Sequence, residues 1–440
     1  MSTAAKLHFL TGRPRVQTQW VFGPRERLRW SIFALKLAVF LVLPWSGAVW
    51  FDVPHRRYHL FGQVFWPQDF YLLGLFLAIA AVMLFFSTAL AARSWCGFAC
   101  PQTLLTHLFM LIDHGVEGDR PARLALDHGQ GRWLRRVLKH GLWLLVSAGL
   151  GLTFARYFVG PGAWGAEALA LAGFITGVTY VFAGHLRDWV CTTVCPYGRF
   201  QGAMQDADSL LVTYDAVRGE PRAKGLAAIA RGACVDCNQC VTACPMGIDI
   251  RQGSQYECIS CQRCVDACND TMGRIGAAPD LIRMASLREQ EARAATGAWP
   301  GRGARHWLRP RVLWYAAVLV VLVGLLAGLT VNRPLLAIAS TRDANRVYAL
   351  PGGRTSDFYR LALLNKDTRV HAVRVELRGL AGQLVGAENE VTLAAGEITT
   401  LNASVVAPAA AGEPRPFAFV LRDVATGAEV GLALATLVTR

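Results

Sequence analysis

Charged residues are scarce in this chain of 440 residues. Asp, Glu, Lys and Arg together make up only 17% of the sequence, whereas hydrophobic residues make up 53%. An average soluble domain has about 25% charged residues. The shortage argues against an ordinary soluble protein and indicates a membrane protein, in a chain long enough for several structural units.

Five apolar runs approach the roughly 20 residues that a helix needs to cross a bilayer. They are Trp30–Trp50, Phe70–Ala92, Gly141–Gly160, Ala163–His185 and Val312–Asn332. A sixth run, Leu104–Ile112, is too short to cross. We expect this sixth run to lie at the membrane interface or to re-enter the membrane from one side.

Basic residues are unevenly distributed among the loops. They are frequent before the first run, between the second and third runs, and in residues 186–311, but few in the loop after the first run and absent from the turn after the third. Because positively charged loops stay on the cytoplasmic side, we expect the N-terminus and residues 186–311 inside and the C-terminus outside. Topology then explains most of the net charge of +14, and no nucleic-acid partner is expected. The basic N-terminal segment has no apolar core of the signal-peptide kind, so we expect an uncleaved first span.

No cysteine lies outside four groups, and two of these groups repeat one spacing. Each reads C-x2-C-x2-C-x3-C, and the two runs are Cys234, Cys237, Cys240, Cys244 and Cys258, Cys261, Cys264, Cys268. This is the ferredoxin spacing, in which the fourth cysteine of a run ligates the other cluster. We therefore expect two 4Fe-4S clusters, one held by Cys234, Cys237, Cys240 and Cys268, the other by Cys258, Cys261, Cys264 and Cys244. A zinc ribbon would show two C-x2-C pairs with a longer spacer, and a disulfide framework would need an oxidising compartment.

The remaining four cysteines form two C-x3-C-P pairs, Cys96/Cys100 and Cys191/Cys195. Each pair directly follows an apolar run, so all twelve cysteines are expected at the inner face. On a helix, residues i and i+4 share a face, and soft thiolates select Cu(I), zinc or iron–sulfur clusters. Four readings stay open: a copper ion, a further cluster, a dithiol/disulfide couple, or small buried residues at helix ends. His107, about two helical turns after Cys100, could face the same site.

Methionine and cysteine are absent from residues 333–440, which contain one histidine, His371. This segment is therefore a poor site for a soft metal ion. Val373, Val375 and Leu377 alternate with charged residues, a period of two that predicts a strand. Further strands are expected at Phe417–Arg422 and Glu429–Thr439, so the segment is typical of an immunoglobulin-like β-sandwich. We expect it to act as a docking domain.

The expected fold is a polytopic α-helical membrane protein of about five spans, with an inserted two-cluster ferredoxin module and a C-terminal immunoglobulin-like β-sandwich. The expected parts are a cytoplasmic tail (residues 1–29), a four-span core with both C-x3-C-P pairs (30–185), the cytoplasmic ferredoxin module (186–276), a linker (277–311), the fifth span (312–332) and the periplasmic β-domain (333–440).

Several motifs resemble one protein family closely. They are WPQD (Trp66–Asp69), RSWCGFACPQT (Arg93–Thr103), VEGDR (Val116–Arg120), CPYGRFQ (Cys195–Gln201), RGEPR (Arg218–Arg222) and the whole segment Cys234–Cys268. They are similar to the FixG/CcoG/RdxA group of cytochrome c oxidase accessory proteins, and the resemblance extends over nearly the whole chain. Where family members often have an acidic run before VEGDR, this chain has Asp113, His114 and Gly115.

The resemblance implies a protein of the bacterial inner membrane that reduces Cu(II) to Cu(I) for assembly of a cbb3-type cytochrome c oxidase. The eight ferredoxin cysteines would then hold the clusters, and Cys96, Cys100, Cys191 and Cys195 would form the copper or redox site. Oxidase subunits or copper-delivery proteins, a cytoplasmic electron donor and membrane lipid would be the partners. Two alternatives stay open: a quinol-linked electron-transfer protein, since the membrane half is also similar to NapH/NosR-type proteins, and a non-catalytic assembly factor.

Overall fold

The computed structural model of the chain describes residues 17–126, 132–160, 162, 164–223, 232–301, 303, 306–367, 369–387, 390–408 and 414–437. The first part of the basic N-terminal segment, residues 1–16, lies outside the described residues. The chain forms two compact units, which are treated separately below. The first comprises Met1–Trp45 and Leu75–Gly324, and the second comprises Ser46–Gly74 and Leu325–Arg440.

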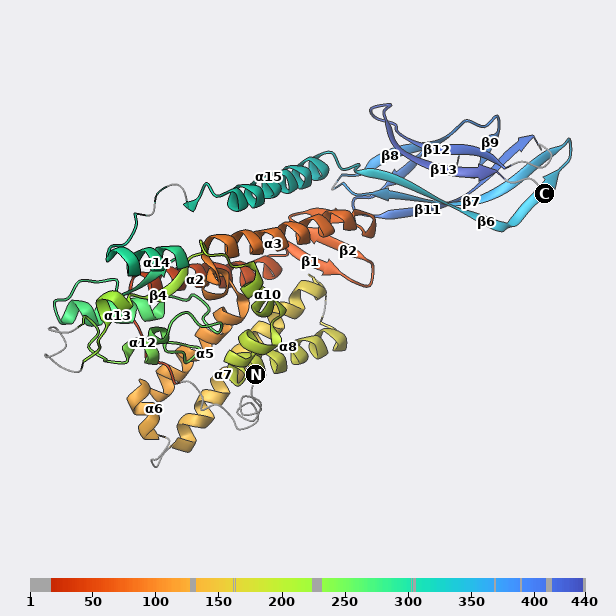
Figure 1. Cartoon of the computed structure of the whole chain (residues 1–440). Helices are drawn as coiled ribbons and strands as arrows, with labels where there is room; N and C mark the ends of the chain where they lie inside the picture. The colour runs from red at the N-terminus through yellow and green to blue at the C-terminus, as the bar shows by residue number, and fades with distance from the viewer. Residues whose placement is uncertain are drawn as a thin grey trace, which may run out of the picture. The chain divides into compact units, whose positions relative to one another are not determined.

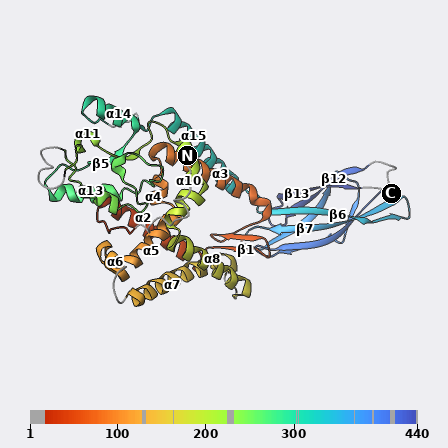
Figure 2. The ribbon, with the colours of Figure 1, turned by 60° about the horizontal axis from the view of Figure 1, so that its bottom comes forward.

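Long helices make up most of the first unit (Figures 1 and 2). In chain order the helices are α2 (Pro24–Trp45), α3 (Phe70–Ala91), α4 (Ser94–Phe98), α5 (Pro101–Glu117), α6 (Arg120–Leu126), α7 (Arg132–Val159), α8 (Ala166–Gly184), α9 (Arg187–Trp189), the π-helix η2 (Val190–Val194), α10 (Pro196–Met204), α11 (Ala216–Gly219), α12 (Gln239–Thr242), η4 (Ile250–Gln252), α13 (Arg263–Arg274), α14 (Leu287–Thr296) and α15 (Pro310–Val331). α3 and α15 each belong partly to the second unit.

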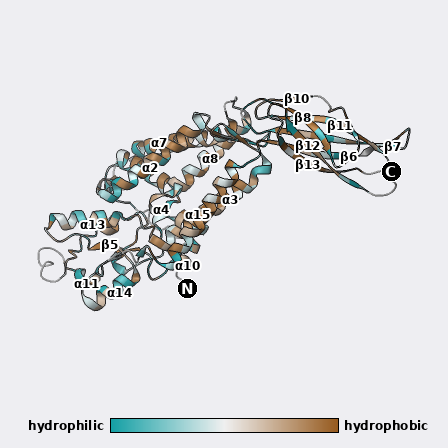
Figure 3. Cartoon of the chain, turned by 90° about the horizontal axis from the view of Figure 1, so that it is seen from above, coloured by the Kyte–Doolittle hydropathy of each residue, from teal (hydrophilic) through white to brown (hydrophobic). Residues whose placement is uncertain are grey.

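Six helical segments of the described chain are long and apolar enough to cross a membrane. They are Pro24–Trp45, Pro67–Ala91, Ser94–Glu117, Trp133–Val159, Ala166–Gly184 and Pro310–Val331. Figure 3 shows hydrophobic residues along much of α3, α8 and α15. Only 6% of the apolar window is buried in the second and in the last segment. Such outward-facing apolar surface suits contact with lipid.

The additional helical segment is Ser94–Glu117, of which the sequence analysis recognised only a short run. Its final turns form ion pairs at the end of the α7–α8 hairpin where α7 begins and α8 ends. Glu117 binds Lys139 in the second turn of α7, and Asp113 binds Arg187 just after α8. Near the same level, Phe109 packs on the ring of Trp143 with centroids 5.3 Å apart. α5 therefore packs against the end of this hairpin where α7 begins and α8 ends. The expectation that this run is too short to cross a membrane is wrong, because the helical segment Ser94–Glu117 has the length and apolar composition to do so.

A small mixed module follows the membrane helices. Strands β4 (Leu211–Tyr214) and β5 (Ile282–Ala285) pair antiparallel on either side of the cysteine-rich segment. Val212 and Ile282 share one buried core with Met272 of α13 and with several of the ferredoxin cysteines. The strand pair therefore closes the two ends of the cysteine-rich segment around its own core.

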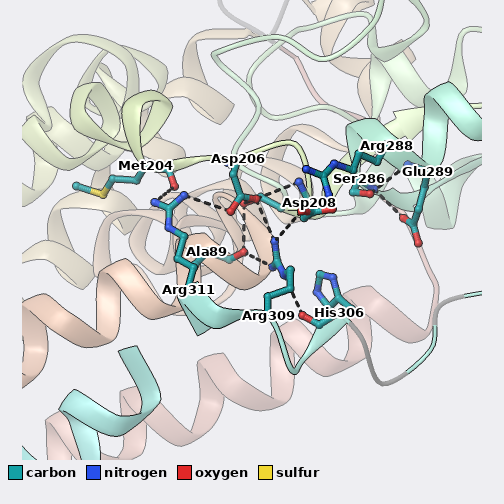
Figure 4. Close-up of polar contacts among 11 residues, drawn as sticks. Ala89, Met204, Asp206, Asp208, Ser286, Arg288, Glu289, His306, Arg309 and Arg311 are labelled. Atoms are coloured by element: carbon teal, nitrogen blue, oxygen red, sulfur yellow. Dashed lines mark hydrogen bonds and ion pairs between the residues drawn. The ribbon is translucent and has the colours of Figure 1, made fainter. Parts of the chain in front are cut away.

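Asp206 connects three segments that are far apart in the sequence (Figure 4). Its carboxylate accepts hydrogen bonds from Arg309 at 3.0 Å and from Arg311 at 3.2 Å. Arg309 also donates to the carbonyl of Ala89, near the end of α3, at 2.7 Å. These contacts join the segment after α10 to the end of α3 and the beginning of α15.

The second unit contains a sandwich of two four-stranded sheets, in the orders β6-β7-β11-β9 and β10-β8-β12-β13. The strands are β6 (Leu336–Leu350), β7 (Arg354–Asn365), β8 (His371–Arg378), β9 (Gln383–Val385), β10 (Val391–Leu393), β11 (Ile398–Pro408), β12 (Arg415–Asp423) and β13 (Glu429–Leu437). Val373 and Val375 are buried while Arg374 between them is exposed, as the period of two predicts. Their core includes Leu361 from one sheet and Phe419 from the other.

The second unit also contains a small three-stranded sheet that the sequence analysis did not foresee. Its strands are β1 (Val49–Asp52), β2 (Arg57–Leu60) and β3 (Gln63–Phe65). The first apolar run was expected to be helical as far as Trp50, but α2 ends at Trp45. Gly47 follows with a positive φ of 71°, which turns the chain out of the helix and into β1.

A buried ionic cluster joins this small sheet to the sandwich within the second unit. The carboxylate of Asp69 accepts a hydrogen bond from Lys366 at 2.7 Å and lies 3.5 Å from the guanidinium of Arg333. All three residues are at most 5% exposed. Val64 and Trp66 pack beside them on Leu364 of β7. Buried charges persist when they are paired in this way.

Candidate functional site

The two ferredoxin runs share an unusual backbone conformation. On either side of the second cysteine of each run the residues have a positive φ: 50° and 58° at Asp236 and Asn238, and 50° and 59° at Ser260 and Gln262. This left-handed conformation costs about 1–2 kcal/mol for a residue other than glycine. Its repetition shows that both runs curl into the same tight loop, as a cluster-binding loop requires.

The fold brings the fourth cysteine of each run to the other run. Cys268 lies within electrostatic range of Cys240, Cys237 and Cys234. Cys258 lies within electrostatic range of Cys261 and Cys244. We call Cys234, Cys237, Cys240 and Cys268 the first cysteine set, and Cys258, Cys261, Cys264 and Cys244 the second cysteine set.

A cavity lies inside the second cysteine set. It is small, about 20 Å³, and all four cysteines of the set line it. Its other walls are mainly apolar and include Val212, Met246, Ile248, Ile250 and Ile259. Four sulfur donors around an apolar cavity fit the requirements of a 4Fe-4S cluster. The donor chemistry of these residues therefore suits the cofactor that the spacing predicts.

Burial makes these thiols hard to ionise. Burial raises the pKa of Cys258 and of Cys268 to about 12, and repulsion between neighbouring cysteine charges contributes to the rise. Burial likewise raises the pKa of Cys240 to about 11. At neutral pH such thiols stay protonated until a metal displaces the proton, so loading of iron must release protons at this site.

The two C-x3-C-P pairs have matching local structures. The first cysteine lies in a short helix, Cys96 in α4 and Cys191 in η2. The second, Cys100 or Cys195, is the N-cap of the next helix, α5 or α10, with proline as the first helical residue. The expectation that the cysteines of a pair share one helix face is therefore wrong, because the proline begins a new helix at each second cysteine.

The fold gathers both C-x3-C-P pairs in one place. Cys191 lies within electrostatic range of Cys100, Cys96 and Cys195, and its burial raises its pKa to about 12. We call these four residues the membrane cysteine group. The group also touches the second cysteine set: Cys96 and Cys191 pack in one apolar cluster with Cys244 and Cys261.

Gly97 makes this close approach possible. A Cβ atom at Gly97 would stand 2.8 Å from the Cα of Cys261 and 2.8 Å from the carbonyl oxygen of Ile259. Real Cβ atoms do not come so close to backbone, so a side chain here would push the two segments apart. The hydroxyl of Thr103 donates to the carbonyl of Cys96 at 2.6 Å and fixes α4 against α5.

The described residues do not present a preformed centre for one metal ion. No group of three or more His, Cys, Asp or Glu side chains in the described ranges converges closely enough to hold a single ion. A cubane cluster has no such requirement, because its four thiolates bind four different irons. The four cysteines of the membrane cysteine group thus lie near one another, but they do not converge on a single ion-binding position.

Arg93, which the sequence analysis did not single out, connects these parts. Its side chain is 3% exposed. The guanidinium donates to the carbonyl of Tyr256 at 2.8 Å and to the carbonyl of Cys191 at 3.2 Å. Its position three residues before Cys96 was visible in the sequence, but its partners lie far away in the chain.

His107 does not join the cysteines. It is 3% exposed, and its Nδ1 lies 2.8 Å from the carbonyl oxygen of Thr103. It lines a separate small cavity together with Arg29, Lys36 and Gly97. The expectation that His107 could share the cysteine site is not supported by this placement.

Family models match three parts of the chain. A 4Fe-4S dicluster domain matches residues 186–287, a 4Fe-4S binding domain matches residues 73–115, and an Ig-like fold at the C-terminus of FixG matches residues 326–432. The second match includes the first C-x3-C-P pair. With the apolar helices, these matches define an iron–sulfur protein of the membrane with a C-terminal Ig-like domain, which confirms the predicted fold class.

Curated relatives extend over most of the chain. It is 34% identical to the nitrogen fixation protein FixG of Rhizobium meliloti, with 88% of this chain and 85% of the relative covered. It is 34% identical to protein RdxA of Cereibacter sphaeroides, covering 82% of each chain, and 33% identical to protein RdxB of the same organism, covering 93% of each. The chain therefore belongs to the FixG/RdxA family.

One solved structure is also similar in part, a FixG-related protein from Vibrio parahaemolyticus. It is 18% identical, with a TM-score of 0.22, over 24% of this chain and 97% of that one. The family assignment rests on the sequence relatives. It confirms the expected resemblance and supports an iron–sulfur redox protein that transfers electrons.

Proposed function

We propose that this protein transfers single electrons from two 4Fe-4S clusters to Cu(II), and that the product Cu(I) serves the assembly of a cbb3-type cytochrome c oxidase. The observation behind the proposal is the contact between the membrane cysteine group and the second cysteine set, made by Cys96 and Cys191 with Cys244 and Cys261. An electron acceptor bound at the membrane group would lie next to an electron carrier.

In this proposal the first and second cysteine sets hold the two clusters. When bound, the clusters supply one electron at a time at the inner face of the membrane. The apolar residues around Cys244 and Cys261 exclude water from the path. Cys96, Cys100, Cys191 and Cys195 bind the copper substrate, and their soft sulfur atoms favour Cu(I) over Cu(II), which assists its reduction.

The proposed topology places the N-terminus and the ferredoxin module in the cytoplasm and the β-sandwich in the periplasm of the bacterial inner membrane. The distribution of basic residues supports it. All twelve cysteines would then lie where thiols stay reduced. The β-sandwich, which lacks soft metal ligands, would dock oxidase subunits or a copper-delivery protein.

Anaerobic stopped-flow on cluster-loaded protein tests the reaction. The clusters are reduced with dithionite, Cu(II) is added, and cluster absorbance is followed beside a Cu(I) chelator. The variant Cys96→Ser/Cys100→Ser/Cys191→Ser/Cys195→Ser should lose cluster reoxidation and Cu(I) formation, while Thr193→Ala, next to the same cysteines, keeps both. Full-rate copper reduction by cluster-free protein, or by the four-serine variant, would overturn the proposal.

A further inference from the structure

A second cavity of about 130 Å³ lies beside the second cysteine set. It is comparable to the engineered cavity of about 150 Å³ that binds one benzene molecule. Its walls carry more polar side chains than the walls of the cavity inside the second cysteine set. They are Arg93, Gln201, Gln205, Leu211, Val212, Ser254, Gln255, Tyr256, Cys258 and Ser260. Tyr256 is 47% exposed at one side, so a ligand can enter from the protein surface.

Gln201 is the strongest sign of a ligand. Its side chain on α10 is fully buried, at 0% exposed. Neither its amide nitrogen nor its amide oxygen has a hydrogen-bond partner among the residues that the structure describes. Burying a donor and an acceptor unsatisfied costs free energy, and such groups are rare in folded proteins. A ligand that both donates and accepts would satisfy them.

Arg93 adds a positive charge to the same cavity. Its two described hydrogen bonds go to neutral carbonyls, those of Tyr256 and Cys191. The guanidinium also lies within electrostatic range of Cys96 and Cys258, and its Nε has no hydrogen-bond partner in the described part of the chain. The guanidinium carbon lies 5.5 Å from the centre of the Tyr256 ring. A carbonyl oxygen that gains negative charge on reduction would be stabilised here.

The position of the cavity indicates a redox ligand. Cys258 of the second cysteine set lines this cavity as well as the cluster cavity. A ring bound against Cys258 would therefore lie beside the proposed cluster. None of the four residues of the membrane cysteine group lines this cavity. A metal ion does not suit the walls, because Cys258 is their one soft ligand.

We propose that this cavity binds the carbonyl-bearing ring of a two-electron organic carrier, a flavin or a quinone, and that electrons enter the protein there. Gln201 would donate to a ring carbonyl and accept from a ring N–H or O–H, and Arg93 would stabilise the reduced ring. The reduced carrier gives up two electrons and two protons. One electron goes to each of the two clusters, and the protons pass to water.

This inference rests on the proposed function for the later fate of the electrons, but its test is separate. Oxidised FMN and decylubiquinone are titrated in turn into the full-length, cluster-loaded protein in detergent, and binding is followed by calorimetry. One of the two should bind at about one per chain, and which one binds identifies the source. Gln201→Leu should weaken this binding at least tenfold, while Gln252→Leu, an exposed glutamine outside the cavity, leaves it unchanged.

Kinetics separate electron entry from electron exit. Reduced FMN or decylubiquinol should reduce the clusters at least tenfold more slowly in Gln201→Leu than in the wild type. Dithionite, which needs no binding site, should reduce both proteins equally, and the dithionite-reduced variant should still reduce Cu(II) if the proposed function is right. If Gln201→Leu loses its clusters, Gln201→Glu replaces it, because it keeps the size and loses the N–H donor. Binding of neither carrier, or equal binding by wild type and variants, would overturn the inference.

Discussion

Gly97 and Cys261 are in contact through their backbones. A methyl group on Gly97 would stand 2.8 Å from the Cα atom of Cys261. The contact joins the short helix α4 to the loop of the second cysteine set, although 164 positions of the sequence separate the two residues. The distance between the membrane cysteine group and the proposed cluster depends on this glycine.

Replacing Gly97 should therefore harm both packing and electron transfer. Gly97→Ala is expected to destabilise the protein by about 1–3 kcal/mol, as other overpacked cores are, and to slow reoxidation of the clusters by Cu(II). Thermal unfolding and stopped-flow measure the two effects. Gly173→Ala is a matched control, because Gly173 lies inside α8 with nothing within 4 Å of its added Cβ. If both variants behave alike, close approach at Gly97 has no special role.

The pairing of cysteines between the two runs predicts a non-additive pattern of losses. Cys268→Ser should remove one cluster and halve the iron content, from about eight to about four atoms per chain. Adding Cys234→Ser should change nothing more, because both residues belong to the first cysteine set. Adding Cys258→Ser instead should remove the second cluster as well.

Iron analysis and electron paramagnetic resonance of the reduced protein follow these losses. The reverse pattern would contradict the pairing across the runs. In that case Cys268→Ser combined with Cys258→Ser would retain a cluster, and Cys268→Ser combined with Cys234→Ser would lose both.

Asp206 should stabilise the first unit in a pH-dependent way. Although its partial burial alone would raise it, hydrogen bonds from Ser209 and the charges of Arg309 and Arg311 hold the pKa of Asp206 below its ordinary value of 3.8. A carboxyl whose folded-state pKa is depressed stabilises the fold above its unfolded pKa, and this contribution disappears as the pH falls through the folded pKa. Because the site is partly exposed, we expect about 1 kcal/mol.

Asp206→Asn should accordingly lower the unfolding temperature by the same amount from pH 8 to pH 5. The difference from wild type should shrink below pH 4. Tryptophan fluorescence during heating measures this. Asp270→Asn is the control, since Asp270 forms an exposed pair with Arg274 and should change little. A difference that persists unchanged at pH 3 would rule out ionisation of Asp206 as the cause.

The buried cluster at Asp69 should be the most sensitive ionic contact of the second unit. Asp69→Ala leaves the charges of Arg333 and Lys366 buried and unpaired, which typically costs about 3–5 kcal/mol. We expect the β-sandwich of this variant to become sensitive to limited proteolysis at a lower temperature. Glu429→Gln breaks the exposed pair of Glu429 with Arg378 and should leave the protease resistance unchanged. Equal resistance of both variants and the wild type would contradict the proposed role of Asp69.

Local patterns predicted much of the fold. The apolar runs became α2, α3, α7, α8 and α15 because hydrophobic length alone decides whether a segment can span a bilayer. The alternation around Val373 became β8 because side chains point to opposite faces along a strand. The helix boundary at Trp45 was missed, since a turn at Gly47 and pairing of β1 with β2 ended a run that is apolar up to Phe51.

Motifs pointed to functional residues without revealing what they do. The family motifs include Asp69, Arg93 and Gln201. The local sequence around these residues does not indicate which distant residues they contact. Asp69 meets Lys366, which is 297 positions away, and Arg93 meets the carbonyl of Tyr256, 163 positions away. The side-chain amide of Gln201 is buried without a hydrogen-bond partner among the described residues because α10 packs against the cysteine loops.

By itself the sequence determined the cofactor chemistry, the apolar spans and the β-sandwich, since these depend on the spacing and periodicity of neighbouring residues. The tertiary structure decided which cysteines face each other, how closely Gly97 lets them approach, and where a buried amide is left beside Cys258. Those features arise when segments distant in the chain pack together, and their geometry depends on contacts that no single segment contains.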